Sequence, residues 1–129
     1  MNCPLCDKPM IVLEIGGVEV DHCLTCKGTW LDAGELELLL DGAENKERLL
    51  ASLDVDARSD EAPRRCPICR KKMRKVRSDP QQRIVIDKCK KNDGLWFDQG
   101  ELREIIAMGD FPGGRRVYEL LNDVFGEHG

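Results

Sequence analysis

Two stretches, Cys3-Pro4-Leu5-Cys6 and Cys23-Leu24-Thr25-Cys26, stand 16 residues apart near the start of this 129-residue sequence. Each is a C-x-x-C turn, which places two thiolates on one side of a metal ion. Two such turns at this separation can complete a tetrahedral site, in which each zinc–sulfur distance is about 2.3 Å. The spacing therefore predicts a structural zinc ion held by four thiolates. The expected ligands are Cys3, Cys6, Cys23 and Cys26.

The same pattern occurs a second time along the chain. Residues 3–6 match 66–69 (Cys-Pro-Ile-Cys) at an offset of 63, and residues 28–36 match 94–102 at an offset of 66. The second copy therefore holds three extra residues between its cysteines, and Ser78-Asp79-Pro80 has the turn chemistry expected of that insertion. A repeat of this length indicates two small structural units of the same kind.

Each copy predicts a β-hairpin between its two turns and a short helix after them. In the first copy, residues 11–15 and 18–21 are rich in β-branched side chains and flank Gly16-Gly17, which is a tight-hairpin signal. The helices are expected to begin at N-caps Asp32 and Asp98, because Glu35 and Glu101 follow three residues later, the spacing of a capping box. The apolar helix positions are Leu36, Leu39 and Leu40 in the first copy and Leu102, Ile105 and Ile106 in the second, and Gly42 and Gly109 are the expected stops.

The second copy lacks one cysteine. Cys66, Cys69 and Cys89 are present, but Asn92 stands where the first copy has Cys26, and an amide is a poor zinc ligand. The fourth ligand is expected to be Asp93, with His128, a water molecule or an empty site as the alternatives. A water molecule in the fourth position would resemble a catalytic zinc site, which uses three protein ligands.

The shared motif G-x-W-x-D-x-G-E-L has a structural and a catalytic interpretation. Trp30 and Trp96 are the largest apolar groups of each unit and are expected to cover the metal turns. Gly28 and Gly94, two residues before the tryptophans, are expected to let the backbone pass close to sulfur or to adopt a positive φ. Glu35 or Glu101 beside a metal could act as a general base, but helix capping explains both carboxylates without catalysis. The remaining motif residues interpreted as structural are Asp32 and Asp98. His22 is expected on the hairpin surface, beside the ligand Cys23 but not as a ligand itself.

Composition narrows the class of protein. Apolar residues make up 41% of the chain and aromatic residues only 5%, which is lean for one well-filled core. The seven cysteines are an odd number, so they cannot all pair as disulfides within one chain. No basic and apolar leader opens the sequence, and no apolar run is long enough to cross a membrane, so a cytoplasmic protein with reduced thiols is expected.

The expected fold is a small, metal-stabilised α+β protein. Its units are a first zinc ribbon with a helix (1–43), a helix and linker (44–63), a second ribbon with a helix (64–109), and a C-terminal amphipathic helix (110–129) that could present Leu121 and Phe125 to a partner. Units of about 40 residues bury too little apolar surface to fold unaided, so a metal ion is physically required.

These motifs resemble the transcription-factor-type zinc-finger family of small bacterial proteins, named for its likeness to the TFIIB zinc ribbon. The first copy meets every motif position, whereas the second departs from it at Asn92. The resemblance covers about residues 3–42 and 66–108, and it implies a zinc-ribbon fold and zinc binding. It implies little about activity.

Charge differs sharply between the two copies, although the whole chain carries a net charge of −4. Residues 1–43 hold two basic and eight acidic groups, whereas residues 63–109 hold thirteen basic and six acidic groups. The second copy is therefore the expected recognition surface, for nucleic-acid phosphate, for an acidic protein, or for the acidic copy of the same or another chain. Aromatic residues that could stack on bases are scarce in the second copy, which has only Trp96 and Phe97, and this counts against nucleic acid. The expected basic face consists of Arg64, Arg65, Arg70, Lys71, Lys72, Arg74, Lys75 and Arg77.

The sequence thus predicts a non-enzymatic, zinc-binding module that binds a macromolecular partner in a regulatory or transcription-related role. One alternative is a thiol- or metal-responsive sensor that uses the incomplete second site. The less favoured alternative is a zinc hydrolase built on Cys66, Cys69 and Cys89.

Overall fold

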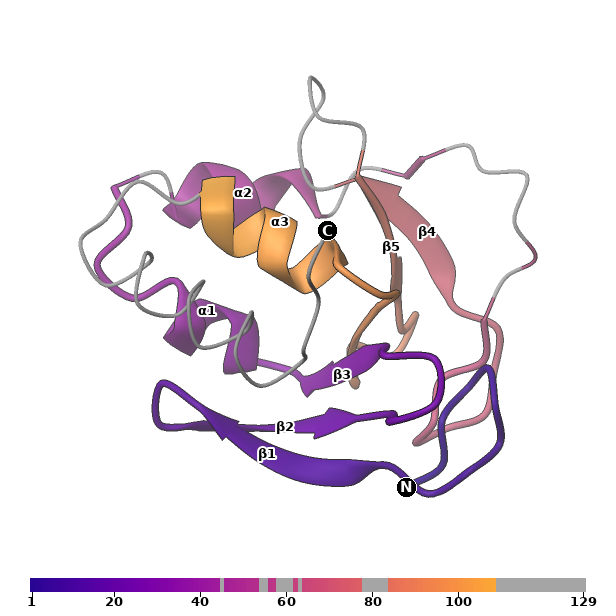
Figure 1. Ribbon diagram of the computed structural model, residues 1–129. Coiled ribbons are helices and arrows are strands. Elements are labelled where there is room, and N and C mark those ends of the chain that lie inside the picture. The colour runs from indigo at the N-terminus through magenta and orange to yellow at the C-terminus, as the bar shows by residue number, and fades with distance from the viewer. Residues whose placement is uncertain (45, 54–55, 58–61, 63, 78–83, 109–129) are drawn as a thin grey trace.

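A computed structural model describes residues 1–44, 46–53, 56–57, 62, 64–77 and 84–108 (Figure 1). Two zinc-ribbon-like halves, each with three strands and a helix, flank one additional helix. The elements are β1 (Ile11–Ile15), β2 (Val18–His22), β3 (Thr29–Asp32), α1 (Glu35–Leu39), α2 (Lys46–Ser52), β4 (Arg74–Arg77), β5 (Val85–Lys88), β6 (Gly94–Phe97) and α3 (Glu101–Met108).

The six strands form one antiparallel sheet in the order β1-β2-β3-β6-β5-β4. The two repeats join through β3 and β6, where Trp30 lies directly opposite Trp96 and Leu31 opposite Leu95. These two strands run antiparallel, and the equivalent residues Trp30 and Trp96 face each other, so the repeats are related by an approximate twofold axis through the tryptophan pair. The sequence left open whether the repeats touch, and the structure shows that they share a sheet.

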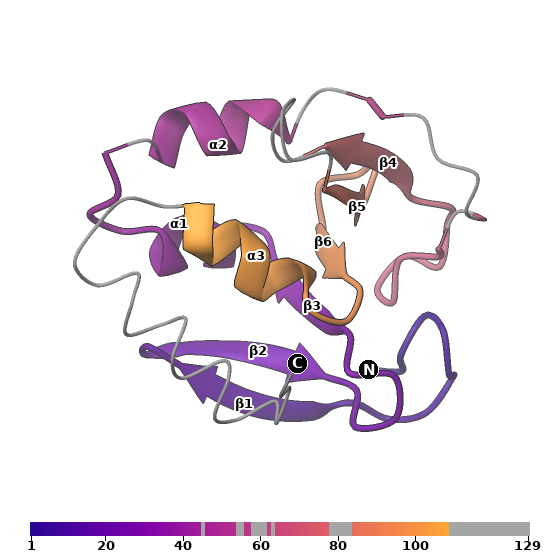
Figure 2. The same ribbon diagram turned by 45° about the horizontal axis from the view of Figure 1, so that its top comes forward.

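The helices pack on one face of this sheet and enclose the main apolar core (Figure 2). Leu31 and Phe97, both fully buried, point into this core from the two central strands. Helix α2 adds Leu49, followed by Leu53 just beyond its end. The six apolar positions predicted for the helices after each ribbon are all buried: Leu36, Leu39, Leu40, Leu102, Ile105 and Ile106.

The predicted N-caps are wrong. Helix α1 begins at Glu35, and the residue before it is Gly34, which has φ 91° and makes no side-chain capping hydrogen bond. Helix α3 begins at Glu101, after Gly100 with φ 83°. Each helix is therefore entered through a left-handed glycine, and Asp32 and Asp98 lie too far back to cap it.

The β-hairpin of the first repeat is confirmed as β1 and β2, and the helix expected near 44–53 is present as α2. Several other expectations lie outside the described residues: the Ser78-Asp79-Pro80 insertion, the helix stop at Gly109, His128, the C-terminal helix, and much of the linker. No helix within the described ranges has the length and apolar character needed to cross a membrane.

Candidate metal centres

The first repeat brings its four cysteines together at one end of the sheet. The ligand atoms of Cys3, Cys6, Cys23 and Cys26 all lie within 4.8 Å of one another. The Cys3 and Cys26 sulfurs are 3.6 Å apart. This separation is much longer than a disulfide bond, and it is close to the value of about 3.8 Å between two sulfurs of a tetrahedral zinc–thiolate site. The geometry therefore fits a Cys₄ zinc ion.

The second repeat builds a matching cluster from three cysteines and a carboxylate. Asp93 Oδ2 lies 3.6 Å from Cys66 Sγ and 3.4 Å from Cys89 Sγ, and Cys69 Sγ lies 3.7 Å from Cys89 Sγ. With zinc–oxygen and zinc–sulfur bonds of about 2.0 and 2.3 Å, a tetrahedral ion would hold these atoms about 3.5 Å and about 3.8 Å apart. The structure thus places Asp93, the expected fourth ligand, where the fourth thiolate stands in the first repeat.

Asp93 reaches the metal position because the second turn closes one residue earlier than its counterpart. In the first repeat the Lys27 N–H donates to the Cys23 carbonyl at 2.9 Å, and Lys27 has φ 65°. In the second repeat the Asn92 N–H donates to the Cys89 carbonyl at 3.0 Å, and Asn92 has φ 63°. The left-handed residue is thus the fourth of the turn in place of the fifth. Asn tolerates this conformation well, so Asn92 shapes the turn and leaves the next residue to act as ligand.

Backbone N–H groups surround the ligand sulfurs. Both Leu5 and Cys6 donate to Cys3 Sγ at 3.4 Å, and Ile68 donates to Cys66 Sγ at the same distance. Such contacts stabilise a thiolate and orient it toward the ion. The turn itself is held by a hydrogen bond of 2.8 Å from the Cys3 N–H to the Lys8 carbonyl.

The thiols of one cluster differ in proton affinity. Burial raises the pKa of the Cys66 thiol to about 12, and burial likewise raises the pKa of Cys26. For Cys23, burial acts in the same direction, but N–H donation by Cys26 and Thr25 brings the pKa down to about 7. Without a cation the thiols of a cluster therefore do not all ionise at neutral pH, and a zinc ion must displace protons to bind.

Both tryptophans lie in a second apolar cluster together with the cysteines of the two centres. Trp30 and Trp96 are fully buried, and each packs on the glycine at the base of the other repeat's second turn. A Cβ atom on Gly28 would overlap the Trp96 ring, and one on Gly94 would overlap the Trp30 ring and the Leu31 carbonyl. The two glycines were expected to approach sulfur or to have a positive φ, and both expectations are wrong. Neither glycine has a positive φ, and each approaches a tryptophan ring.

The motif carboxylates hold the tryptophans and the helix entries. Trp30 Nε1 donates to Asp32 Oδ1 at 2.8 Å, and the Asp32 N–H donates to Glu35 Oε1 at 2.6 Å. The second repeat has the same two hydrogen bonds, from Trp96 to Asp98 at 3.0 Å and from Asp98 to Glu101 at 2.7 Å. The glutamate half of the capping box is therefore present, while the aspartate side chain anchors tryptophan. These contacts explain the carboxylates without a general-base role.

His22 was expected on the surface, and this expectation is wrong. Its exposed fraction is 2%, and its Nδ1 lies 3.2 Å from Thr29 Oγ1 on the neighbouring strand. His22 lies on the same face of β2 as the buried Val18 and Val20, so the alternation of this strand was the signal that could have predicted its burial.

The eight expected basic residues do not form one exposed face. Lys75 is largely buried, with its Nζ 2.8 Å from Oδ1 of the buried Asp87, and Arg74 pairs with Asp56 at 2.7 Å. Arg64 Nε lies 4.0 Å from Asp98, and Arg77 is half-buried. The exposed members are Arg65, Arg70, Lys71 and Lys72, which all surround the first turn of the second repeat.

The family described as "Transcription factor zinc-finger" matches residues 2–42 and 65–108. The two matched segments coincide with the two repeats and cover more than half of the sequence, so the chain belongs to this family. No curated protein and no solved structure matches the chain. Family membership and the geometry of the two clusters agree on a protein with two tandem zinc ribbons, of which the second has an altered ligand set.

Proposed function

We propose that this protein is a non-enzymatic zinc-binding module that recruits an acidic protein partner in a regulatory role. Its zinc ions fix the ends of the turns and leave the turn tips free for recognition. The fourth position of the second centre is filled by Asp93, whereas a catalytic zinc keeps that position open for water. This arrangement favours a structural role for both ions.

The observation that carries the proposal is a surface at the metal-bearing end of the sheet, which we call the knuckle face. Its apolar tips are unusually exposed for side chains of their type, with exposed fractions of 48% for Met1, 40% for Leu5, 59% for Leu24 and 49% for Ile68. The first turns of the two repeats line a common groove of about 380 Å³, to which Pro4, Pro67 and Arg70 contribute. Met1 also lines this groove, and apolar groups exposed beside a groove mark interaction sites.

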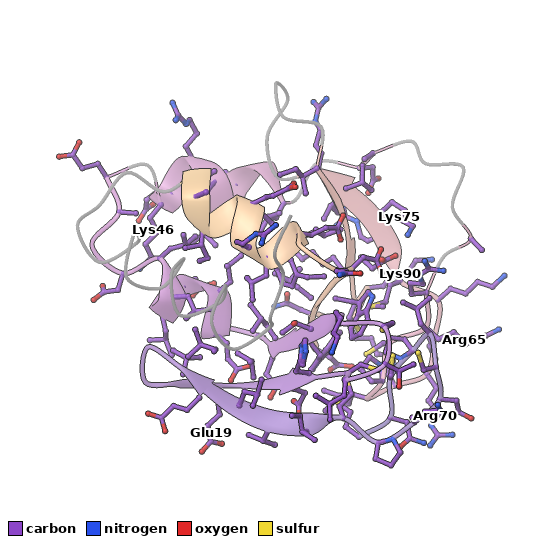
Figure 3. The ribbon with its side chains drawn as sticks, viewed as in Figure 1. Glu19, Lys46, Arg65, Arg70, Lys75 and Lys90 are labelled. Atoms are coloured by element: carbon purple, nitrogen blue, oxygen red, sulfur yellow. The ribbon has the colours of Figure 1, made fainter. Side chains whose placement is uncertain are left out.

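Cations border this groove on the side of the second repeat. Arg65 and Arg70 project from the end where the sulfur atoms gather, whereas Glu19 projects near the far end of the β1–β2 hairpin (Figure 3). The cations of the knuckle face are Arg65, Arg70, Lys71 and Lys72. Exposed apolar side chains at the turn tips, bordered by cations, fit a partner segment in which acidic and apolar side chains alternate.

Buried aromatic residues favour protein over nucleic acid as the partner. Trp30, Trp96 and Phe97 are the aromatic residues within the described ranges, and each has an exposed fraction of 0%. Single-stranded nucleic acid gains much of its affinity by stacking bases on exposed aromatic rings. The tryptophans and Phe97 are instead used to join the repeats.

A peptide in which Asp and Glu alternate with Leu provides the direct test. We expect it to bind the zinc-loaded protein, and we expect the double variant Arg65→Glu/Arg70→Glu or the variant Ile68→Ser to weaken binding by about tenfold or more. Arg48→Glu, which inverts an exposed cation on α2, is the matched control and leaves binding unchanged. Mixed-sequence DNA and RNA are tested at two salt concentrations. Tight, salt-dependent binding to these and none to the peptide would reject the proposal.

A metal-responsive role is a second candidate, and the carboxylate ligand favours it. Thiolates hold zinc more strongly than a carboxylate does, so the second centre is expected to release its ion first. Stepwise chelation with a colorimetric zinc indicator distinguishes the candidates. Two separated release steps, with loss of knuckle-face binding at the first step, support a sensor, whereas a single step supports a purely structural role.

A further inference from the structure

The two edges of the shared sheet are not equivalent. At one edge, the linker residues Asp56 and Ala57 run alongside β4, with Asp56 bridged to Val76. The Ala57 N–H donates to the Lys75 carbonyl at 2.9 Å, and Arg74 pairs with Asp56 at 2.7 Å. At the other edge, β1 ends the strand order, and no bridge to β1 from beyond it is found within the described ranges (Figure 1). Among the residues that the structure describes, one edge is therefore covered and its symmetry mate is open.

The internal repeat shows which groups of β1 point outward. Val12 corresponds to Lys75 at the offset of 63, and each lies opposite the equivalent aspartate of the next strand, Asp21 and Asp87 respectively. Because the N–H and C=O of one strand residue point to the same side, the outward carbonyl of Lys75 implies an outward N–H and C=O at Val12. Alternation agrees, since the Met10 N–H also points away from β2 and donates to the Met1 carbonyl at 3.0 Å.

The side chains of β1 leave this edge accessible. Val12 is 60% exposed and Ile11 is 37% exposed. Edge strands that must stay single usually carry lysine, proline or a bulge, and IVLEI has none of these. An open, apolar edge of this kind is suited to pairing with an added strand.

Charge identifies the kind of strand. Glu14 and Glu19 are exposed and lie directly opposite each other on β1 and β2, where like charges repel. The segment that covers β4 brings a carboxylate to Arg74, so the complementary segment at the acidic ribbon must bring a cation. A second copy of β1 would instead add two more glutamates to this pair.

We propose that the β1 edge binds an extended, lysine- or arginine-bearing segment of a partner protein as an added antiparallel strand, in the way residues 56–57 cover β4. The incoming strand donates to and accepts from the main chain of Val12, packs an apolar side chain beside Ile11, and places a cation beside Glu14 and Glu19. This surface is separate from the knuckle face, so the proposal does not rest on the proposed function.

The test uses a synthetic basic peptide that forms strands readily, with the sequence of residues 71–77 (KKMRKVR). In the zinc-loaded full chain we expect chemical-shift changes concentrated on β1 and β2, together with slower hydrogen exchange at the Val12 amide. A peptide with glutamate in place of each cation is the control for charge, and it is not expected to change the shifts of β1 and β2 or the exchange of the Val12 amide.

Val12→Pro removes the outward N–H of residue 12 and leaves every hydrogen bond between β1 and β2 in place. Proline is tolerated at such a position on an edge strand. We expect it to weaken peptide binding by about tenfold, the effect of losing one or two hydrogen bonds, while Val12→Thr leaves binding within about twofold of the parent. Unchanged zinc content and unchanged binding of the acidic peptide show that the variant is folded.

Binding of the basic peptide that survives Val12→Pro, shift changes confined to another surface, or concentration-dependent self-association through β1 would overturn the proposal. If Val12→Pro fails to fold, exchange at the Val12 amide of the parent protein decides the question. Slower exchange on peptide addition supports an added strand, and unchanged exchange rejects it.

Discussion

Asn92 shows how one residue changes the chemistry of a metal centre without changing its geometry. It occupies the position of Cys26, yet it contributes a left-handed backbone conformation, with φ 63°, in place of a ligand. The turn closes between Cys89 and Asn92, and the carboxylate of Asp93 then reaches both neighbouring sulfurs. The loss of a cysteine is therefore compensated by a shift of one position along the chain.

The conformation of Asn92 gives a prediction that separates backbone from side chain. Asn92→Gly keeps the left-handed turn and is expected to retain the second zinc ion. Asn92→Ala removes the short polar side chain that makes the left-handed conformation tolerable for a residue with a Cβ. We expect a cost of about 1 kcal/mol in unfolding free energy and weaker zinc binding at the second centre. Urea unfolding of the zinc-loaded variants and competition with a zinc indicator measure both effects. Equal behaviour of the two variants would show that the turn does not depend on this conformation.

Glu35 combines a useful hydrogen bond with an unfavourable charge. Burial raises its pKa, and the nearby carboxylates Asp32, Asp21 and Glu19 raise it further, while the Asp32 N–H acts in the opposite direction. The folded state therefore holds the proton of Glu35 more tightly than the unfolded state does. Stability contributed by this group is greatest at low pH and falls as the pH rises through the raised pKa.

Glu35→Gln keeps an oxygen acceptor for the Asp32 N–H and removes the charge. The variant is expected to exceed the parent by an amount that grows as the pH rises above the ordinary pKa of glutamate. The gain should reach about 0.5 kcal/mol at about pH 8, because the repulsion is partly screened by solvent. Urea unfolding at saturating zinc across this range measures the difference. Glu37→Gln, at an exposed position of the same helix, is the control. A gain that shrinks as the pH rises would contradict the argument.

At the scale of elements, the contact between β3 and β6 accounts for the invariant spacing within the G-x-W motif of both repeats. Each tryptophan packs against a glycine of the other repeat, and each glycine precedes the tryptophan of its own repeat by two residues. The motif thus encodes one repeat's half of a reciprocal contact. An isolated ribbon would have the residues but not the partner.

This packing predicts different coupling at the two glycines. The atoms nearest to the Cβ of Gly28→Ala all belong to the Trp96 ring, so the overpacking cost of about 2–3 kcal/mol should be partly relieved when combined with Trp96→Phe. The Cβ of Gly94→Ala also meets the Leu31 carbonyl, which Trp30→Phe cannot move. Double-mutant cycles from urea unfolding should give a coupling of about 1 kcal/mol for the first pair and a smaller one for the second. Equal couplings would argue against the reciprocal contact.

Local chemistry made the ligands predictable, whereas roles that depend on the other repeat were not. Cysteine spacing located both clusters, and the preference of zinc for charged ligands selected Asp93 over Asn92. Gly28 was expected to approach sulfur or to have a positive φ, and its actual neighbour is Trp96 of the other repeat, which the sequence of one ribbon does not reveal. The surface position expected for His22 was also wrong, because His22 shares the buried face of β2 with Val18 and Val20. Asp32 was misassigned for a related reason, since its partner is a tryptophan turned inward against the opposite strand.

At the scale of the whole molecule, the shared sheet places two metal centres of formal charge −2 in one apolar cluster, with charges of opposite sign on the outer surfaces of the repeats. Residues 1–43 carry a net charge of −6 and residues 63–109 a net charge of +7. The proposed surfaces follow this division, with acidic segments expected at the knuckle face and basic strands at β1. This small protein would thereby bind two partners of opposite charge at separate surfaces.

The shared clusters also predict that the two zinc ions stabilise a single cooperative unit. Trp96, from the second repeat, packs with ligands of both centres, and the main core mixes side chains from β2, β5 and all three helices. Loss of the first ion by Cys6→Ser should therefore lower protection from hydrogen exchange at Ile86 and Phe97 in the second repeat as well as in the first. Lys8→Ser, at an exposed position just after the same turn, is the control and should leave exchange unchanged. Because each repeat alone would expose its tryptophan and lose half of the central strand pair, a fragment of residues 1–43 should remain unfolded even with zinc. A folded fragment, or unchanged protection in the second repeat of Cys6→Ser, would show that the ribbons are energetically independent despite their common sheet.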